Sequence, residues 1–527
     1  MRLFQKKTII AIFSFIYINF NSQEKINILW LVCEDQSLFF SSYNDSIAKT
    51  PNIEELASKG IVYDNFFSVS PVCSPSRSSI ITGMYPTTIG TQHMRAYKKN
   101  KGSINTKTNL PIYSAIPKRE VKFFTENLRK MGYFCSNNSK EDYNMKMSPL
   151  AWDESNKNAH WRNRQENQPF FSVFNFNITH ESRIWSNYKK HNSEEINKVI
   201  LPPFLPNNNI IKNDFITNYK NIEKLDEQLG KIINQLKEDG LYENTVIFFF
   251  SDHGGPFPRY KRSIYDSGLK CPLIIKWTEA RNELRNNQMI SFIDLAPTIL
   301  ELTKSEINHE MEGVSFYNQN NRDYIFAATD RFDEYTDKRR CVRNKEFKLI
   351  LNCDTNSSIM KPVSYRQNMK TMRILDSIND LKKNNIYIDN WYKKTKPKYE
   401  LYDIVNDHYE LKNLYTNKDY DSVFYELKKK LDNWIDESDY GNMSEEHMLE
   451  EMFSNEFRQM KLNLPTIKKS NEGFIIYSNN SGASIGYRTN KNLSWKIIEN
   501  GNQIISENAF ELLMFKPGYE LFLETFK

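Results

Sequence analysis

Two continuous apolar stretches, each followed directly by charged or polar residues, constrain the fold of this chain most. INILWLVC begins at residue 26 and precedes Glu34 and Asp35, whereas TVIFFFS begins at residue 245 and precedes Asp252 and His253. Runs of this length that are apolar throughout are typical of parallel strands buried on both faces of a sheet. Stretches with helical spacing and helix-ending glycines alternate with such runs, and the longest is expected from about Asp214 to Glu238. The sequence therefore predicts an α/β fold with a large, mostly parallel sheet flanked by helices.

The pattern changes further along the chain and divides it into segments. After about residue 330, short strands mix with a long amphipathic helix, which predicts a smaller α+β subdomain over residues 331–462. Residues 463–527 contain alternating apolar and polar positions, which predict a small β-rich module. The larger α/β domain then occupies residues 23–330.

The N-terminal segment, residues 1–22, has a basic start followed by an apolar run from Thr8 to Phe20. This run is shorter than the roughly 20 residues that a membrane-spanning helix needs. It predicts a secretory signal peptide. An uncleaved anchor is the alternative, because the region near Ser22 has no clear cleavage site. We expect a periplasmic or secreted protein without a stable membrane partner.

Charge and cysteine content exclude several classes of protein. The 71 basic and 65 acidic residues nearly balance, which argues against a nucleic-acid-binding protein and against an acidic disordered chain. The six cysteines form no CxxC pair and no regular spacing, so no disulfide framework is expected.

The polar residues that follow the two apolar runs form a candidate metal site. Because the carboxyl ends of parallel strands meet at one edge of a sheet, Glu34, Asp35, Asp252 and His253 are expected to converge there. Three carboxylates and an imidazole would bind a hard divalent cation mostly through oxygen. Helix capping or turn formation is the alternative for either pair alone, and the presence of both pairs favours the metal.

The segment CSPSRSSIITG places a cysteine at the start of a predicted helix. Ser74 suits the N-cap, Pro75 the first helical position and Gly83 the end of the helix. Cys73 would then lie directly before the helix, where free N–H groups and the helix dipole favour an anion, and Arg77 adds a positive charge one turn later. A buried structural cysteine is the alternative, which the specific pattern of neighbours disfavours.

CSPSRSSIITG resembles the signature of the type I sulfatases. TPNIEELASKGIVYDNFFS before it, and LRKMGY and DLAPTILE after it, occur in the order typical of that family. GMYPTTIGTQHMR, THES and YDSGLKCPLIIKW resemble the branch that contains heparan N-sulfatase and bacterial polysaccharide sulfatases, and ELYDIVNDHYELKNLY resembles the C-terminal subdomain. The resemblance covers about residues 25–439. It implies an alkaline-phosphatase-like fold in which residues 23–330 form the catalytic domain.

The resemblance also implies that Cys73 is the precursor of the nucleophile. In this family a formylglycine-generating enzyme oxidises the cysteine to formylglycine (3-oxoalanine), whose aldehyde is hydrated to a geminal diol. One hydroxyl attacks sulfur and displaces the substrate oxygen or nitrogen. The second hydroxyl then loses its proton, so that the carbonyl re-forms and sulfate leaves.

The calcium ligands of the family fall on Glu34, Asp35, Asp252 and His253, together with the modified Cys73. Glu34 replaces the commoner aspartate, and His253 replaces the commoner asparagine. The resemblance therefore implies calcium as the cofactor, with two departures in the ligand set.

Other catalytic positions of the family fall on charged residues of this chain. The resemblance implies that Arg77 steadies the formylglycine, that His180 in THES lies near the leaving group, and that Lys261 contacts the sulfate. A strand-end packing role is the alternative for His180. A solvated basic turn is the alternative for Lys261, because Arg259 and Arg262 flank it.

One family motif is only partly present. Lys140 falls on the lysine of Gly-Lys-x-His, but Asp142 stands at the histidine position. Because a carboxylate does not replace an imidazolium beside an anion, His93 and Arg95 in TQHMR are the candidate substrate-binding residues that would supply the missing charge. Ordinary loop contacts are the alternative for both.

The leading hypothesis is a calcium-dependent sulfatase that hydrolyses sulfate esters or N-sulfates of a sulfated oligo- or polysaccharide. A phosphate or phosphonate mono- or diesterase of the same superfamily is one alternative, and a catalytically inactive carbohydrate-binding homologue is another. The intact Cys73, Arg77 and metal positions favour an enzyme, and the SPSRSSIITG and TQHMR segments favour sulfate.

Overall fold

The structure is a computed structural model that describes residues 25–97, 109–279, 281, 283–306, 310–318, 322–381, 386–453, 460–470, 473–504 and 509–526. The predicted signal peptide, residues 1–22, lies outside the described residues. Among the helices of the described part, none has both the length and the apolar character needed to cross a bilayer.

A nine-stranded sheet forms the centre of the larger domain, and its main path runs β4-β3-β5-β1-β6-β8-β2-β7, with β9 paired to β2. The strands are β1 (Asn27–Cys33), β2 (Ile61–Phe67), β3 (Phe134–Asn138), β4 (Glu154–Ser155), β5 (Phe170–Phe176), β6 (Thr245–Ser251), β7 (Lys270–Cys271), β8 (Leu273–Lys276) and β9 (Arg285–Ser291). β1 runs parallel to β5 and β6, whereas β8 runs antiparallel to β6 and β2. The predicted α/β fold with a mostly parallel sheet is confirmed.

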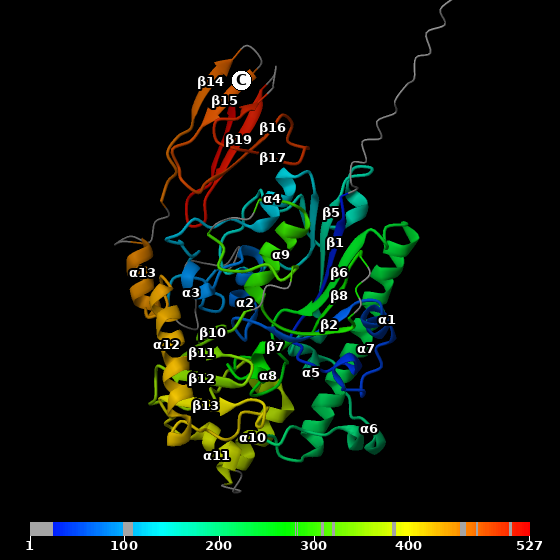
Figure 1. The fold of residues 1–527 in the computed structure, drawn as a ribbon, viewed down its shortest axis with the longest axis vertical. Coiled ribbons are helices and arrows are strands. Elements are labelled where there is room, and N and C mark those ends of the chain that lie inside the picture. The colour runs from blue at the N-terminus through cyan, green and yellow to red at the C-terminus, as the bar shows by residue number, and fades with distance from the viewer. Residues whose placement is uncertain are drawn as a thin grey trace, which may run out of the picture.

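Helices cover both faces of this sheet (Figure 1). The helices of the larger domain are α1 (Pro51–Ser58), α2 (Cys73–Thr82), α3 (Pro86–Ile89), α4 (Phe124–Lys130), α5 (Ser182–Ser186), α6 (Ser193–Lys198), α7 (Asn209–Glu238), α8 (Asp266–Leu269) and α9 (Leu295–Leu302). Successive residues of β1 point to opposite faces. Trp30 therefore packs with side chains of α2, α4 and α9, and Leu31 packs with side chains of α1 and α7.

A second, antiparallel sheet follows in the order β10-β11-β12-β13. Its elements are β10 (Ile325–Phe332), β11 (Tyr335–Arg343), β12 (Phe347–Asn352) and β13 (Tyr399–Asp403), with α10 (Lys370–Asp380), α11 (Ile386–Tyr392), α12 (Asp421–Glu437) and α13 (Glu445–Phe453). Leu349 of β12 and Leu427 of α12 share a core cluster with Trp30, so the two sheets are joined by one apolar core. The expected division between residues 330 and 331 falls inside β10.

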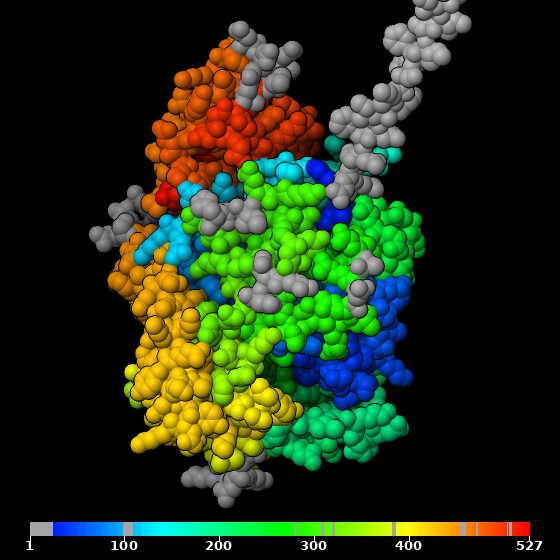
Figure 2. Space-filling model, in the orientation of Figure 1, coloured from blue at the N-terminus to red at the C-terminus, as the bar shows by residue number. Residues whose placement is uncertain are grey.

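The C-terminal segment forms two small antiparallel sheets, ordered β14-β15-β18 and β17-β16-β19-β20. The strands are β14 (Thr466–Ser470), β15 (Gly473–Tyr477), β16 (Ser484–Arg488), β17 (Lys496–Ile498), β18 (Gln503–Ile504), β19 (Phe510–Phe515) and β20 (Phe522–Phe526). This β-rich tail stands as a lobe on one end of the molecule (Figure 2). Arg129 of α4 donates a hydrogen bond to the carbonyl of Trp495 over 2.8 Å, and Lys130 pairs with Glu499, which anchors the tail to α4.

Two helix starts differ from the sequence prediction. α2 begins at Cys73, and Val72 occupies the N-cap position, because the Ser74 hydroxyl donates to Asp142 over 2.8 Å and does not cap the helix. Cys73 therefore belongs to the first turn and does not precede it. The long helix, expected from about Asp214, starts at Asn209, because the side chain of Asn208 accepts a hydrogen bond from the Ile210 N–H and caps it.

Candidate active site

The two polar strand ends meet because β1 and β6 are neighbours in the sheet. Cys33 lies opposite Ser251, so the residues that follow each strand emerge side by side. The Asp35 N–H donates to Oδ1 of Asp252 over 3.0 Å, and Asp35 itself has a φ of 54°. This left-handed backbone is uncommon outside glycine and turns the Asp35 carboxylate towards its partners.

Helix α2 brings Cys73 against this edge. The Cys73 Sγ atom lies 3.3 Å from Nε2 of His253 and 3.7 Å from Nζ of Lys261, and the residue is only 1% exposed. The hydroxyl of Ser76, also on α2, donates to the backbone oxygen of Asp252. The first turn of the helix is therefore fixed to the end of β6, as the signature predicts.

The donor set fits a divalent cation. One ligand atom from each of Asp35, Cys73, Asp252 and His253 lies within 4.8 Å of the others, and Glu34, Asp35 and His180 form an overlapping group. Oδ1 of Asp35 is buried and has no hydrogen-bond partner, although His253 Nε2 lies 3.1 Å away outside hydrogen-bond alignment. A buried carboxylate oxygen whose one neighbouring cation is out of hydrogen-bond alignment is well suited to contact a metal ion.

The charges of the cluster are strongly coupled. Burial raises the pKa of Asp35, but the positive charges of Lys261, His180 and His253 outweigh it and hold the pKa well below its usual range. Burial opposes charge on His253 too, yet Asp252, Cys73 and Asp35 raise its pKa to about 10. In the metal-free site His253 is therefore an imidazolium that partly balances the carboxylates.

Three further cations surround Cys73 and the carboxylates. Arg77 Nε donates to Oδ2 of Asp252 over 3.0 Å, Lys140 Nζ donates to Oε2 of Glu34 over 2.7 Å, and Lys261 Nζ donates to Oδ2 of Asp35 over 2.7 Å. The pKa of Lys261 is raised although burial opposes its charge, because Asp35 and Cys73 stabilise the ammonium. Such fixed positive charges are what binding of a tetrahedral anion requires.

His180 lies at the edge of this group. Its Nε2 is 3.4 Å from Lys261 Nζ, and its Nδ1 is 2.9 Å from the Ser182 hydroxyl. Burial and the charge of Lys261 lower the pKa of His180. The predicted residues Glu34, Asp35, Cys73, Arg77, Lys140, His180, Asp252, His253 and Lys261 are thus linked by direct contacts in one cluster.

The two candidate substrate-binding residues, His93 and Arg95, differ in their burial and in their charge. His93 is buried; its described contacts are with the Arg331 N–H at 3.3 Å and the Glu445 carboxylate at 3.6 Å, and burial lowers its pKa. A neutral histidine in this position holds β10 against α13 and supplies no positive charge. Arg95 has a 33% exposed side chain and pairs with Asp333, so its charge is available beside the cluster.

Several residues of the site were not predicted from the sequence. Glu181 donates its N–H to Asp35 Oδ2 over 2.7 Å, and its carboxylate accepts two hydrogen bonds from Arg262. Asn175 accepts from Arg77 over 2.8 Å. The sequence contained a clue to each of the two residues. Asn175 lies near the end of β5, the strand beside β1, and Glu181 directly follows His180 in THES.

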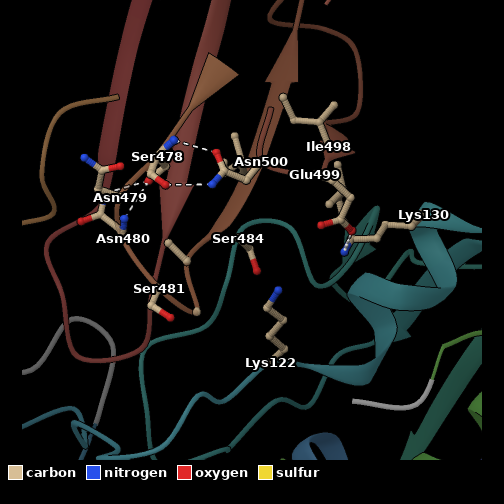
Figure 3. Close-up of a pocket in the computed structure, with 14 residues that line it drawn as sticks. Lys122, Lys130, Ser478, Asn479, Asn480, Ser481, Ser484, Ile498, Glu499 and Asn500 are labelled. Carbon is tan, nitrogen blue, oxygen red and sulfur yellow. Dashed lines mark hydrogen bonds and ion pairs between the residues drawn. The ribbon is translucent and has the colours of Figure 1, made fainter. Parts of the chain in front are cut away.

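Figure 3 shows a pocket of about 330 Å³ between the β-rich tail and α4, lined by polar side chains that include Lys122, Ser484 and Asn500. Among the described residues that line it, none belongs to the Cys73 cluster. The pocket is a feature of the tail interface and does not identify the catalytic site.

Comparison with known proteins agrees with this geometry. The family model described as Sulfatase matches residues 26–305, and the model described as N-sulphoglucosamine sulphohydrolase, C-terminal, matches residues 257–397. An ulvan-active sulfatase of Formosa agariphila is 38% identical over 542 residues, which cover 94% of this chain and 90% of that protein. The human N-sulphoglucosamine sulphohydrolase is 22% identical, over 77% of this chain and 89% of its own.

The fold is shared with solved structures. A structure determined in complex with its substrate D-glucosamine-2-N,6-O-disulfate matches with a TM-score of 0.56 and 16% identity, over 80% of this chain and 100% of that chain. The predicted alkaline-phosphatase-like fold and the predicted family are confirmed. The chain belongs to the sulfatase family and is a hydrolase of sulfate esters.

Proposed function

We propose that this sulfatase removes sulfate groups from a sulfated polysaccharide, with an aldehyde formed at Cys73 as the source of the nucleophile and calcium as the metal. The observation that carries the proposal is the position of Cys73 Sγ, 3.3 Å from His253 and 3.7 Å from Lys261. A thiol at this place is surrounded by groups suited to bind an anion and a cation at once.

The modification gives the chain a nucleophile that an unmodified thiol lacks. Oxidation of Cys73 by a maturation enzyme would convert its CH₂–SH group to an aldehyde, and the hydrate of that aldehyde supplies the attacking oxygen. The buried first turn of α2 keeps this oxygen beside Lys261 and Arg77. Such positioning lowers the entropic cost of attack on sulfur.

The surrounding cations would bind and orient the sulfate. Lys261 carries its positive charge in nearly dry surroundings, and Lys140 carries its charge in a partly buried position, where contacts to an anion are stronger than in water. Arg77 holds the Asp252 carboxylate and Asn175 on either side of its guanidinium. His180 Nε2 would give a proton to the departing oxygen or nitrogen of the sugar.

The carboxylates Glu34, Asp35 and Asp252, together with His253 and the modified Cys73, would hold calcium. When bound, the ion supplies positive charge to the sulfate oxygens and lowers the pKa of a hydroxyl beside it. Arg95 is the residue we assign to the substrate beyond the sulfate, because its charge is partly exposed.

A sulfated polysaccharide of the ulvan type is the first substrate to test, since the Formosa agariphila relative with 38% identity is described as ulvan-active. An N-sulfated glucosamine is the second substrate to test, because residues 257–397 match the model of the N-sulphoglucosamine sulphohydrolase C-terminal part. Because a polysaccharide does not enter a cell, we also propose a secreted or periplasmic location.

The test is a sulfate-release assay on protein co-expressed with a formylglycine-generating enzyme. Ulvan oligosaccharides, an N-sulfated glucosamine and an aryl phosphate would be compared. We expect sulfate from at least one sugar and little phosphate. Cys73→Ala should abolish release, whereas Cys353→Ala, at an exposed cysteine, should not.

Peptide mass spectrometry provides the second readout. The peptide that contains Cys73 should be lighter than the thiol form in active protein. Full activity of protein in which that peptide is unmodified would overturn the mechanism. Faster release of phosphate than of sulfate would favour the phosphoesterase alternative.

A further inference from the structure

A small cavity behind the catalytic cluster is surrounded by positive charge. It has a volume of about 20 Å³, and Arg259, Arg262, Lys361 and Arg366 are among the side chains that line it. No carboxylate is present among the described residues of its lining. Phe332, which also lines it, packs in the same apolar cluster as Cys73, so the cavity lies close to the site.

Two of the four cations are neutralised by nearby acids. Arg262 donates to Glu181 over 2.7 Å and to Asp333 over 2.9 Å. Lys361 lies 4.0 Å from the carboxylate of Asp337. The positive charges of Arg262 and Lys361 are therefore balanced by carboxylates of the protein and need no bound anion.

Arg259 has no such partner. It is 6% exposed, and its guanidinium lies 3.9 Å from the ring centroid of Tyr265 and 4.8 Å from that of Phe204. Its Nη2 donates to the carbonyl of Glu410 over 2.7 Å, but its Nη1 has no hydrogen-bond partner. Within the described residues Arg259 forms no ion pair, and the nearby Glu410 carboxylate is paired with Lys348 at 2.9 Å.

Arg366, which also lines the cavity, is likewise a buried arginine without an ion pair in the described part of the chain. It is 4% exposed, its Nη2 donates to the carbonyl of Lys361 over 3.0 Å, and its Nε has no partner. Burial, with the nearby charge of Arg262, lowers its pKa to about 10, so it remains charged at neutral pH. It too forms no ion pair within the described residues.

A buried guanidinium without a counter-charge is costly, because the charge has lost its water and gained no anion. We propose that the cavity binds one monovalent inorganic anion, chloride by size, between Nη1 of Arg259 and Nε of Arg366. A space above roughly 10–15 Å³ accommodates a single water-sized occupant. A single chloride fits this space, and a water molecule there would leave both guanidinium groups without an ion pair.

The ion has a route into the cavity. A larger pocket of about 210 Å³ adjoins it and shares Arg259, Ile359 and Trp391 with it. Lys393 lines that pocket and would draw an anion inward, although Glu400 and Glu410 also line it. The bound ion would offset the excess charge that otherwise competes with Lys261 and Arg262 for Glu181.

Anomalous diffraction tests the site directly. Crystals of the wild-type protein grown or soaked in sodium bromide should show a bromide peak between the two guanidinium groups. Arg366→Met keeps an unbranched, flexible side chain and removes the charge, and it should lose the peak. A peak-free cavity holding only water in the wild-type protein would overturn the proposal.

Thermal unfolding gives a second readout in solution. At constant sodium concentration, replacing gluconate by chloride should raise the Tm of the wild-type protein, by about 1 °C for each tenfold rise in chloride above its Kd in a chain of this size. Arg162→Met, at an exposed arginine paired with Asp239, should keep the shift. Equal Tm values in the two salts would count against the site.

Discussion

Nε2 of His253 lies 3.3 Å from Sγ of Cys73, although the two residues are 180 positions apart in the chain. The same nitrogen lies 3.1 Å from the carboxylate of Asp35, so one edge of the imidazole faces both groups. Because Asp252, Cys73 and Asp35 raise its pKa to about 10, His253 adds a positive charge to the site when no metal is bound. Four predictions follow from this site and from the charges that support the fold around it.

Calcium binding should be pH-dependent, and His253 should cause it. A ligating histidine must be neutral, so binding must displace the proton that the raised pKa holds. The affinity should rise with pH by up to about tenfold per unit between pH 6 and 9. His253→Asn should remove most of this slope and bind at least as tightly at pH 7. Calorimetry in buffers of different ionisation enthalpy measures both quantities, with His447→Asn on exposed α13 as the control.

His180 should act on the leaving group. His180→Ala should lower the rate on an alkyl sulfate roughly 10²–10⁴-fold, the usual range for general acid catalysis. The rate on an activated aryl sulfate should fall much less, because that leaving group needs little protonation. As the acid form is required, the wild-type alkyl rate should fall as pH rises past the lowered pKa of His180.

This comparison requires equal metal content and equal oxidation of Cys73 in both proteins. His447→Ala should leave both rates unchanged. Equal losses on the two substrates would mean that His180 positions the sulfate and does not protonate the sugar.

Glu181 should stabilise the site and the fold. Its buried carboxylate accepts hydrogen bonds from Arg262 at 2.7 and 2.9 Å and lies 3.3 Å from Lys261. Glu181→Gln removes one of two counter-charges from each cation, because Asp35 still pairs with Lys261 and Asp333 with Arg262, so the free energy of unfolding should fall by about 1–3 kcal/mol. Urea unfolding measures it, and Glu194→Gln, at an exposed position, should cost almost nothing.

The Glu181 carboxylate should also make the stability of the protein sensitive to acid. Burial raises the pKa of Glu181, but Arg262 and Lys261 lower it to about 2, below its unfolded value. The stability that it contributes is therefore complete above about pH 4.5 and is lost as pH falls towards 2. A variant whose unfolding free energy equals that of the wild type at pH 7 would contradict both statements.

Asp214 should have the opposite pH dependence. Its carboxylate on α7 accepts hydrogen bonds from the N–H and hydroxyl of Thr371, at the start of α10, but burial outweighs them and raises its pKa to about 6. A raised pKa means that stability is highest below the unfolded value of 3.8 and is lost as pH rises to about 6.

Asp214→Asn removes that loss. Relative to the wild type, the variant should therefore gain stability between pH 4 and 7, by up to roughly 3 kcal/mol. Denaturant unfolding at several pH values would reveal the gain. Asp389→Asn, at an exposed aspartate, serves as the matched control, and parallel pH curves for wild type and Asp214→Asn would refute the assignment.

Local sequence determined much of this protein. The run before Glu34 is apolar at every position from Ile28 to Cys33 because both faces of β1 are covered, and that pattern is readable without a structure. The polar residues after β1 and β6 had to lie at one edge once the strands were parallel. The signature around Cys73 predicted the helix α2 and the family, because its residues act within one or two turns.

The tertiary structure decided the contacts between distant segments. Nothing in the sequence says that Lys261 reaches Asp35 across 226 positions, or that Arg262 joins Glu181 to Asp333. The same holds for Ser74, which has the chemistry of an N-cap but bonds Asp142, because β3 and the loop after it bring that carboxylate to the start of α2. Periodicity and capping preferences depend only on a residue's neighbours in the sequence. Strand order and packing decide which distant charges form ion pairs in the buried interior. They also leave Arg259 and Arg366 without an ion pair among the described residues.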